Sequence, residues 1–327
     1  MSTTLEPEPT LEPGSNNTRS TASERVRNRF AASRLKFKWL GVSKSLSSEQ
    51  KSQAAESFGA EGDSISAGKK LLNTKHEAYK ALTSLKSQIT RFWKDNSLAF
   101  PGETGVRLIK QDRITEFEGA FQQYKSDLAE AVRQLEVHYS DLKEAARIRL
   151  GALYDSSDYP SSLEDEFGVE WDFPNVEAPE YLRQLNPKVY AQQSRRVAER
   201  FDRAVELAEQ AFIEELDRLV NHMAERLAGD DDGKPKIFRD SAVANFSEFF
   251  ARFRELNVSS NEQLDALVNR CEQLMSGVQP QGLRDNESLR RSLSTNLATV
   301  QSSLDQLLVN RPRRNIIRRN PSSTGSQ

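Results

Sequence analysis

The closest approach to a nucleotide-binding loop is the segment 62–70, which reads Gly-Asp-Ser-Ile-Ser-Ala-Gly-Lys-Lys. A phosphate-binding loop needs four residues between its glycines, and a Ser or Thr after its lysine to bind Mg²⁺. Here five residues separate Gly62 from Gly68, and Lys70 occupies the Ser/Thr position. No strand pattern precedes the segment either. It is therefore predicted to be a linker.

A second short motif, Gly102-Glu103-Thr104-Gly105, has the form of the loop that clamps a nucleic-acid backbone in KH domains. That loop lies between two short helices with basic residues nearby. Here Glu103 has the wrong charge for phosphate, and a very long helix is predicted to follow. We predict a plain turn between two helices.

The remaining chemically reactive side chains form no catalytic or metal-binding pattern. The histidines, each alone on a predicted helix, are His76, His138 and His222. His138 and Cys271 fall on apolar helix positions, so a core histidine and a buried, inert thiol are expected. Distant acids such as Asp158 and Glu166 have no partner that supports catalysis. No catalytic residue, metal ligand or cofactor is predicted, and the chain is not expected to be an enzyme.

Positive charge gathers in two segments although the net charge of the chain is only −2. Residues 24–44 carry a net charge of +6, and residues 311–319 are rich in arginine, whereas residues 152–185 carry −8. Flexible arginines bind nucleic-acid phosphates without sequence preference, but an Arg-rich end can equally dock a partner or keep a chain soluble. The candidate contact residues for nucleic acid or a partner are Arg25, Arg27, Arg29, Arg34, Arg311, Arg313, Arg314, Arg318 and Arg319.

The composition is that of a chain from a reducing compartment. A single cysteine excludes an intramolecular disulfide. No apolar run approaches the roughly 18 residues of a membrane span, and the Glu- and Pro-rich N-terminus does not resemble a secretory signal. A cytoplasmic protein without membrane contact is expected.

The strongest periodic signal covers residues 112–150. Apolar residues such as Phe117, Phe121 and Leu135 recur there at steps of three and four, which predicts a helix about 60 Å long. A helix of this length needs a partner, and a second such run covers 187–228, with Asn186 and Pro187 as its cap and first turn. We therefore expect a mainly α fold, an elongated antiparallel helical bundle built on these two long helices.

Two short stretches show the period-two alternation of strands instead. Residues 35–42 place Leu35, Phe37 and Trp39 on one side and lysines on the other. In residues 167–173 the apolar side chains of Phe167, Val169, Trp171 and Phe173 alternate with Gly168, Glu170 and Asp172. For 35–42 a basic amphipathic helix is the alternative, but the three-and-four spacing is lacking. A lone strand leaves its backbone groups unpaired. The two stretches are therefore predicted to pair as a small two-stranded β element, with Trp39 and Trp171 largely buried.

Several short motifs carry a family resemblance. They are Trp39-Leu40-Gly41 with Lys44, Gly105-Val106-Arg107-Leu108-Ile109, Asp158-Tyr159-Pro160-Ser161, Phe238-Arg239-Asp240-Ser241 with Asn245, and Leu256-Asn257-Val258. Over most of residues 35–308 the chain resembles a mostly helical family of uncharacterised bacterial and tailed-phage proteins, a domain of unknown function. Members are often encoded near AAA+ ATPases of the cobaltochelatase type, so the resemblance implies such an ATPase as a partner, in a bacterial or phage-infected cell. It brings no catalytic residues.

These observations predict a single helical domain over residues 31–309, between a disordered tail at 1–30 and a disordered Arg-rich tail at 310–327. The function that they favour is that of a non-enzymatic interaction or scaffold protein, phage-encoded and partnered with an AAA+ ATPase. The alternative is a nucleic-acid-binding protein that uses the basic segments 25–44 and 311–319.

Overall fold

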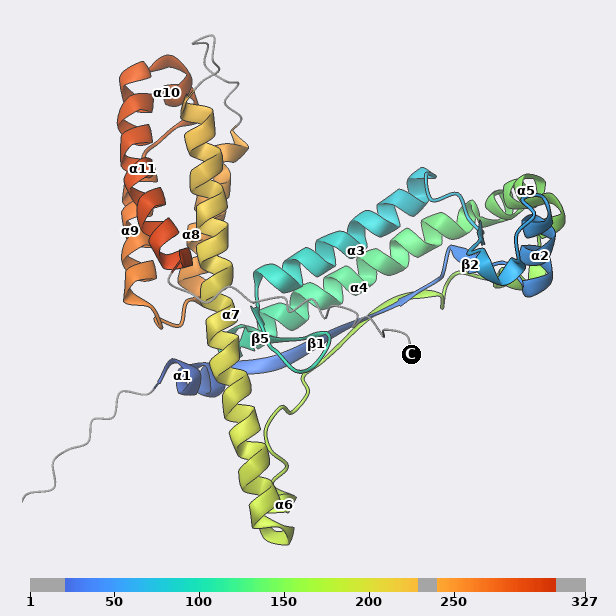
Figure 1. The fold of residues 1–327 in the computed structure, drawn as a ribbon, viewed down its shortest axis with the longest axis horizontal. Coiled ribbons are helices and arrows are strands. Elements are labelled where there is room, and N and C mark those ends of the chain that lie inside the picture. The colour runs from blue at the N-terminus through green and yellow to red at the C-terminus, as the bar shows by residue number, and fades with distance from the viewer. Residues whose placement is uncertain (1–20, 229–239, 310–327) are drawn as a thin grey trace, which may run out of the picture.

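The computed structural model describes residues 21–228 and 240–309 (Figure 1). The fold is mainly α-helical, as predicted, with a four-stranded antiparallel sheet and a separate two-stranded one. Two hydrophobic cores lie against the larger sheet. Among the described helices, none combines the length and the apolar character needed to span a bilayer.

The larger sheet is built on one long strand. Its strands are β1 (Phe30–Trp39), β4 (Leu98–Ala99), β5 (Val106–Lys110) and β6 (Phe167–Asp172), in the order β4-β5-β1-β6. β1 pairs with β5 along its first half and with β6 along its second, where Leu35 lies opposite Trp171 and Lys36 opposite Glu170. The predicted pairing of 35–42 with 167–173 is confirmed, in a sheet with more strands than expected.

One lobe is a group of helices around α7. Its helices are α1 (Ala22–Arg29), α6 (Tyr181–Leu185), α7 (Pro187–Ala228), α8 (Ser241–Leu256), α9 (Glu262–Met275), α10 (Pro280–Asp285) and α11 (Glu287–Val309). α7 covers the range predicted for the second long helix, and Asn186 Oδ1 accepts a hydrogen bond from the Val189 N–H at 3.2 Å as its cap. α1 lies inside the predicted 1–30 tail and buries Val26 completely, so the predicted boundary at residue 30 is wrong.

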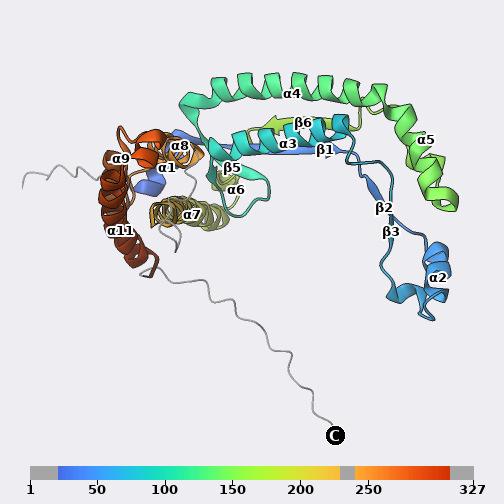
Figure 2. The same ribbon diagram turned by 90° about the horizontal axis from the view of Figure 1, so that it is seen from above.

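In the second lobe, α3 (Glu77–Asp95) and α4 (Ile114–Val137) lie side by side over the β1–β6 half of the sheet (Figure 2). Phe92 of α3 packs between aromatic rings of α4, with ring centroids 5.8 Å from Phe121 and 5.5 Å from Tyr124. The main helical partner of α4 is thus α3, and that of α7 is α11. The predicted bundle of the two long helices with each other does not form. Periodicity shows that a helix needs a partner, but it does not show which one.

The helix predicted over 112–150 breaks at His138, and α5 (Tyr139–Leu150) turns away from the α3–α4 pair (Figure 2). The predicted positions Phe117, Phe121 and Leu135 are buried, but Val132 is buried between them, and Tyr139 is buried in place of His138, which is exposed. The Tyr139 hydroxyl donates to the Pro160 carbonyl at 3.0 Å, and burial raises the pKa of Tyr139 to about 12. At the break the buried position is therefore Tyr139 rather than His138, and the Tyr139 hydroxyl has a partner in the following connection.

A small unit beyond the break holds the two-stranded sheet, and we call it the tip. Its elements are β2 (Ser43–Ser45), α2 (Ser48–Glu56), β3 (Gly68–Lys70) and the 3-10 turns Gly62–Ser64, Gly151–Leu153 and Ser156–Asp158. α2 starts at a capping box, in which Ser47 and Gln50 each accept a hydrogen bond from the backbone N–H of the other. The segment 62–70 ends in β3 and leads into no helix, so it lacks the helix of a phosphate-binding loop.

Two details of the sheet differ from expectation. The turn at 102–105 joins β4 to β5 rather than two helices, and Gly102 and Gly105 have φ values of +101° and +77°, which favour glycine. Trp39 and Trp171 are partly buried rather than largely buried. The Trp171 ring lies 5.3 Å from that of Phe121, at the margin of the second core.

Candidate functional site

Acidic residues of the 152–185 connection neutralise much of the basic segment predicted to bind nucleic acid. Arg27 forms an ion pair with Glu177. Arg34 donates to both carboxylate oxygens of Asp172, at 3.0 and 2.9 Å, and Lys36 Nζ lies 3.6 Å from the same carboxylate. The hydrogen bonds from Arg34 lower the pKa of Asp172. The two oppositely charged segments therefore meet within the molecule.

The other two candidate arginines in the described part of the chain, Arg25 and Arg29, do not converge on one site. Arg25 donates to the carbonyls of Val258 and Ser259, at 2.9 and 3.1 Å, and Arg29 is exposed. The candidates that lie outside the described residues are Arg311, Arg313, Arg314, Arg318 and Arg319. Arg25, Arg27 and Arg34 have intramolecular partners, so the described part of the predicted contact set is largely engaged.

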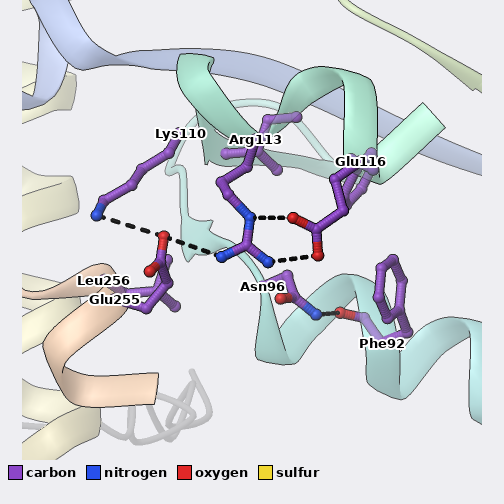
Figure 3. Close-up of a pocket in the computed structure, with 9 residues that line it drawn as sticks. Phe92, Asn96, Lys110, Arg113, Glu116, Glu255 and Leu256 are labelled. Atoms are coloured by element: carbon purple, nitrogen blue, oxygen red, sulfur yellow. Dashed lines mark hydrogen bonds and ion pairs between the residues drawn. The ribbon is translucent and has the colours of Figure 1, made fainter. Parts of the chain in front are cut away.

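The junction between the two lobes holds a cluster of ion pairs around a small cavity (Figure 3). Glu255 of α8 lies 3.4 Å from Lys110 at the end of β5 and 3.4 Å from Arg113 before α4. Arg113 also holds Glu116 through two contacts of 2.6 Å. The cavity measures about 10 Å³, which is at most the space of one water. The cluster joins the lobes and leaves no space for a ligand.

In the tip, the Asp158 side chain is fully buried between two lysines. Its Oδ2 lies 2.6 Å from Lys69 Nζ, and Lys44 forms an ion pair with its Oδ1. Lys69 also donates to the Leu153 carbonyl at 2.7 Å. The hydrogen bonds from Lys44 and Lys69 lower the pKa of Asp158, and this carboxylate is correspondingly a weak base. Asp158 therefore holds β2 and β3 against the turn at 156–158.

His76 and His138 lie at helix ends, whereas Cys271 is buried in a core. His76 accepts a hydrogen bond from the Ala78 N–H at 3.3 Å as the cap of α3, and its ring lies 4.9 Å from that of His138. His138 is exposed at the helix break, so the prediction of a core histidine is wrong. Within residues 21–228 and 240–309, no group of three or more His, Cys, Asp or Glu is placed to hold a metal. Cys271 is buried as predicted, and burial raises its pKa to about 12.

The outer edge of β6 is open within the described part of the chain, where β6 is the last strand in the sheet order and pairs only with β1. In an antiparallel ladder every second residue directs its N–H and C=O away from its partner strand. Half of the six residues of β6 therefore face outward. The described residues supply no hydrogen-bond partner for the backbone of this outer edge.

One flank of α4 runs along this edge. Its residues on that side recur at steps of three and four and are Gln122, Lys125, Ala129, Arg133 and Glu136. Two hollows of about 390 and 550 Å³ separate these residues from β6 and share Lys125, Val169 and Glu170. Together the hollows follow β6 from Phe167 to Asp172. We call this continuous space the β6 groove.

The floor of the β6 groove is apolar and its rims are charged. Leu128 and Val132 of α4, with Phe167 and Val169 of β6, are buried beneath it. The charged lining residues without an ion pair inside the described part of the chain are Lys38, Lys125, Glu136, Glu164, Asp165 and Glu170. Of these, Glu136 accepts a hydrogen bond from the Leu163 N–H at 2.6 Å. An edge strand beside a helix, with open backbone groups, is the geometry that accepts an extended peptide as an added strand.

Sequence reasoning did not find this groove. It predicted a strand at 167–173 and a helix over 112–150, but not that this strand would be an edge or that the helix would lie beside it. One local signal was present, since Ala129 interrupts an otherwise long and polar series on the flank of α4 beside β6. No family model, curated protein or solved structure matches this chain.

Proposed function

We propose that this chain is a non-enzymatic interaction protein that binds an extended segment of a partner protein in the β6 groove, as a fifth strand of the sheet. The observation that carries the proposal is the unpaired outer edge of β6 alongside α4. Each backbone hydrogen bond formed there contributes about 0.5–1.5 kcal/mol net. Alternate side chains of the added strand lie over Phe167 and Val169, so burial of apolar surface adds to the binding free energy.

Binding to nucleic acid has less support. Three of the four described candidate arginines of the basic segment are engaged, with Arg27 and Arg34 paired to acids and Arg25 to backbone carbonyls. These contacts have to break before those side chains reach phosphates. An AAA+ ATPase of the cobaltochelatase type, implied by the family resemblance, is a specific partner to test for the segment that the groove receives.

The test uses the full chain and a library of random octapeptides displayed on phage. Selected peptides are synthesised, and their affinities are measured by titration calorimetry. We expect them to slow amide hydrogen exchange along 167–172, because an added strand bonds the outward N–H groups. Ala129→Trp fills the groove from the exposed face of α4 and is expected to abolish binding.

Ser126→Trp is the matched control, since Ser126 is exposed on the same helix but does not line the hollows. This variant is expected to bind the selected peptides as the natural chain does. Peptides that bind Ala129→Trp unchanged, or that leave exchange along 167–172 unaffected, contradict the proposal. The same pair of variants tests an AAA+ ATPase in a pull-down with purified components.

A further inference from the structure

We infer that the β6 groove selects a segment in which apolar and basic side chains alternate, with a lysine or arginine beside Glu170. This inference rests on the proposed function and names the chemistry of its partner. Side chains of an added strand point alternately to the two faces of the sheet. Each face of the groove therefore contacts every second side chain of the bound segment.

On the face away from α4, the neighbours of the added strand are Gly168, Glu170 and Asp172. Asp172 is already held by Arg34 and Lys36. Glu170 is exposed and has no ion pair inside the described part of the chain, even though its register partner is Lys36. Opposite charges directly across neighbouring strands stabilise a sheet and like charges destabilise it. A basic residue is therefore favoured beside Glu170.

Two further acids extend this preference toward the start of β6. Glu164 and Asp165 are exposed and line the same hollow as Glu170. Gly168 has no side chain, and a Cβ added there would meet only Lys38 Cβ, at 3.8 Å. The space over Gly168 thus admits a side chain that lies beside Lys38, with Glu164 and Asp165 lining the same hollow.

On the face toward α4, the neighbours are apolar. Phe167 and Val169 are 6% and 1% exposed, and Ala129 is the small residue of the helix flank above them. Lys125 and Arg133 lie on this flank too, and Arg133 already pairs with Glu130. Lys125 and Arg133 therefore lie beside the apolar positions of the bound strand, where the aliphatic parts of their side chains can cover apolar surface. The basic positions of the bound strand point to the opposite face, away from these two cations.

The test compares three capped octapeptides that alternate valine with lysine, with glutamate or with serine. Their affinities for the full chain are measured by titration calorimetry at low and at high salt. The Val/Lys peptide is expected to bind roughly five-fold more tightly than the Val/Ser peptide, the scale of one or two cross-strand ion pairs. The Val/Glu peptide is expected to bind more weakly than Val/Ser, and added salt is expected to narrow both differences.

Glu170→Lys is the decisive variant, because it reverses the charge at the exposed position beside the bound strand. It is expected to reverse the order of the Val/Lys and Val/Glu peptides. Glu199→Lys on α7 makes the same change in net charge at an exposed position that does not line the groove. This control is expected to leave the order unchanged.

The outcomes separate this inference from the proposed function. Equal affinities for the three peptides, with protection of 167–172 in each case, overturn the charge preference and leave strand addition standing. No binding by any strand-forming peptide overturns both. Two further results overturn the inference that the groove binds a foreign partner. One is that the free chain forms a dimer in which the 167–172 amides are protected from exchange. The other is that the Val/Lys peptide binds more tightly after all five arginines at 311–319 are replaced by serine. The first result assigns the groove to a second copy, and the second assigns it to the chain's own basic segment.

Discussion

Replacement of Asp158 by asparagine tests whether the tip depends on one buried carboxylate. Asp158 has no exposed side-chain surface, and the side chains of its partners Lys69 and Lys44 are 6% and 56% exposed. The asparagine side chain would keep the shape of the aspartate but remove its charge. Lys69 would then remain buried, with the Leu153 carbonyl as its partner, whereas Lys44 can turn to water.

The expected cost follows from this asymmetry. Removal of one partner of a buried ion pair costs about 3–5 kcal/mol, because the remaining charge is left uncompensated. Since Lys44 is half exposed, we expect the lower end, about 3 kcal/mol. The double variant Lys69→Met with Asp158→Asn removes both charges and is expected to recover much of this loss.

The loss is expected in the tip first. The Leu71 N–H donates to the Val42 carbonyl and the Leu46 N–H to the Ala67 carbonyl, so hydrogen exchange at these two amides reports on the β2–β3 pairing. In Asp158→Asn both amides are expected to exchange about a hundred-fold faster, which corresponds to about 3 kcal/mol. Asp155→Asn, at a neighbouring acid whose side chain bonds only to Ser157, is the control and should have a small effect.

The pH dependence gives an independent check. Since the two lysines lower the pKa of Asp158 in the folded chain, its stabilisation is fully present above the unfolded carboxyl pKa of about 3.9. It is lost as the pH falls through the lower folded value. The difference between the natural chain and Asp158→Asn should therefore be largest near neutral pH and shrink below about pH 4. A loss under about 1 kcal/mol at neutral pH, or a double variant that is less stable than the single one, refutes this account.

Three other predictions concern stability. Trp171→Ala is expected to lower the unfolding free energy by about 2 kcal/mol in denaturant titrations, less than the roughly 3–5 kcal/mol of a fully buried tryptophan, because the ring is only partly buried. Asp217→Asn is expected to stabilise the chain by about 1 kcal/mol in calorimetry at neutral pH. Burial raises the pKa of Asp217, and its Oδ1 has no hydrogen-bond partner within the described residues. The gain in stability should disappear below about pH 4, where Asp217 is protonated in both the folded and the unfolded chain. Glu255→Gln should cost under about 1 kcal/mol by the same calorimetry, because Lys110 and Arg113 are partly exposed.

Features with a local cause were predictable from the sequence. The capping pair Ser47 and Gln50, and the cap at Asn186 before a first-turn proline, bond to backbone only three residues away. The pairing of β1 with β6 was also accessible, because each stretch has an aromatic face and the opposite faces carry opposite charges. That pairing joins residues far apart in the sequence, yet the alternation that predicts it lies within each of the two short stretches.

Features decided by distant contacts were not predictable. The helix breaks at His138, beside the contact of Tyr139 with the Pro160 carbonyl, and no periodicity in 112–150 reveals that contact. β5 was not predicted, because Val106 and Leu108 enter one core and Ile109 the other. Apolar and polar residues therefore alternate little along this strand. The β6 groove depends on the place of β6 in the sheet order and on the position of α4 beside it, and no local pattern shows either.

The position of β1 has a consequence for synthesis on the ribosome. Arg34 of β1 and Asp172 of β6 are 138 residues apart, so at about 5–20 residues per second the strand waits roughly 7–28 s for this neighbour. During that interval Leu35, Phe37 and Trp39 have no strand beside them on this side. Lys36 and Lys38 alternate with them, and charges in such positions keep an unpaired strand from aggregating. The two lysines therefore protect the nascent chain before β6 exists.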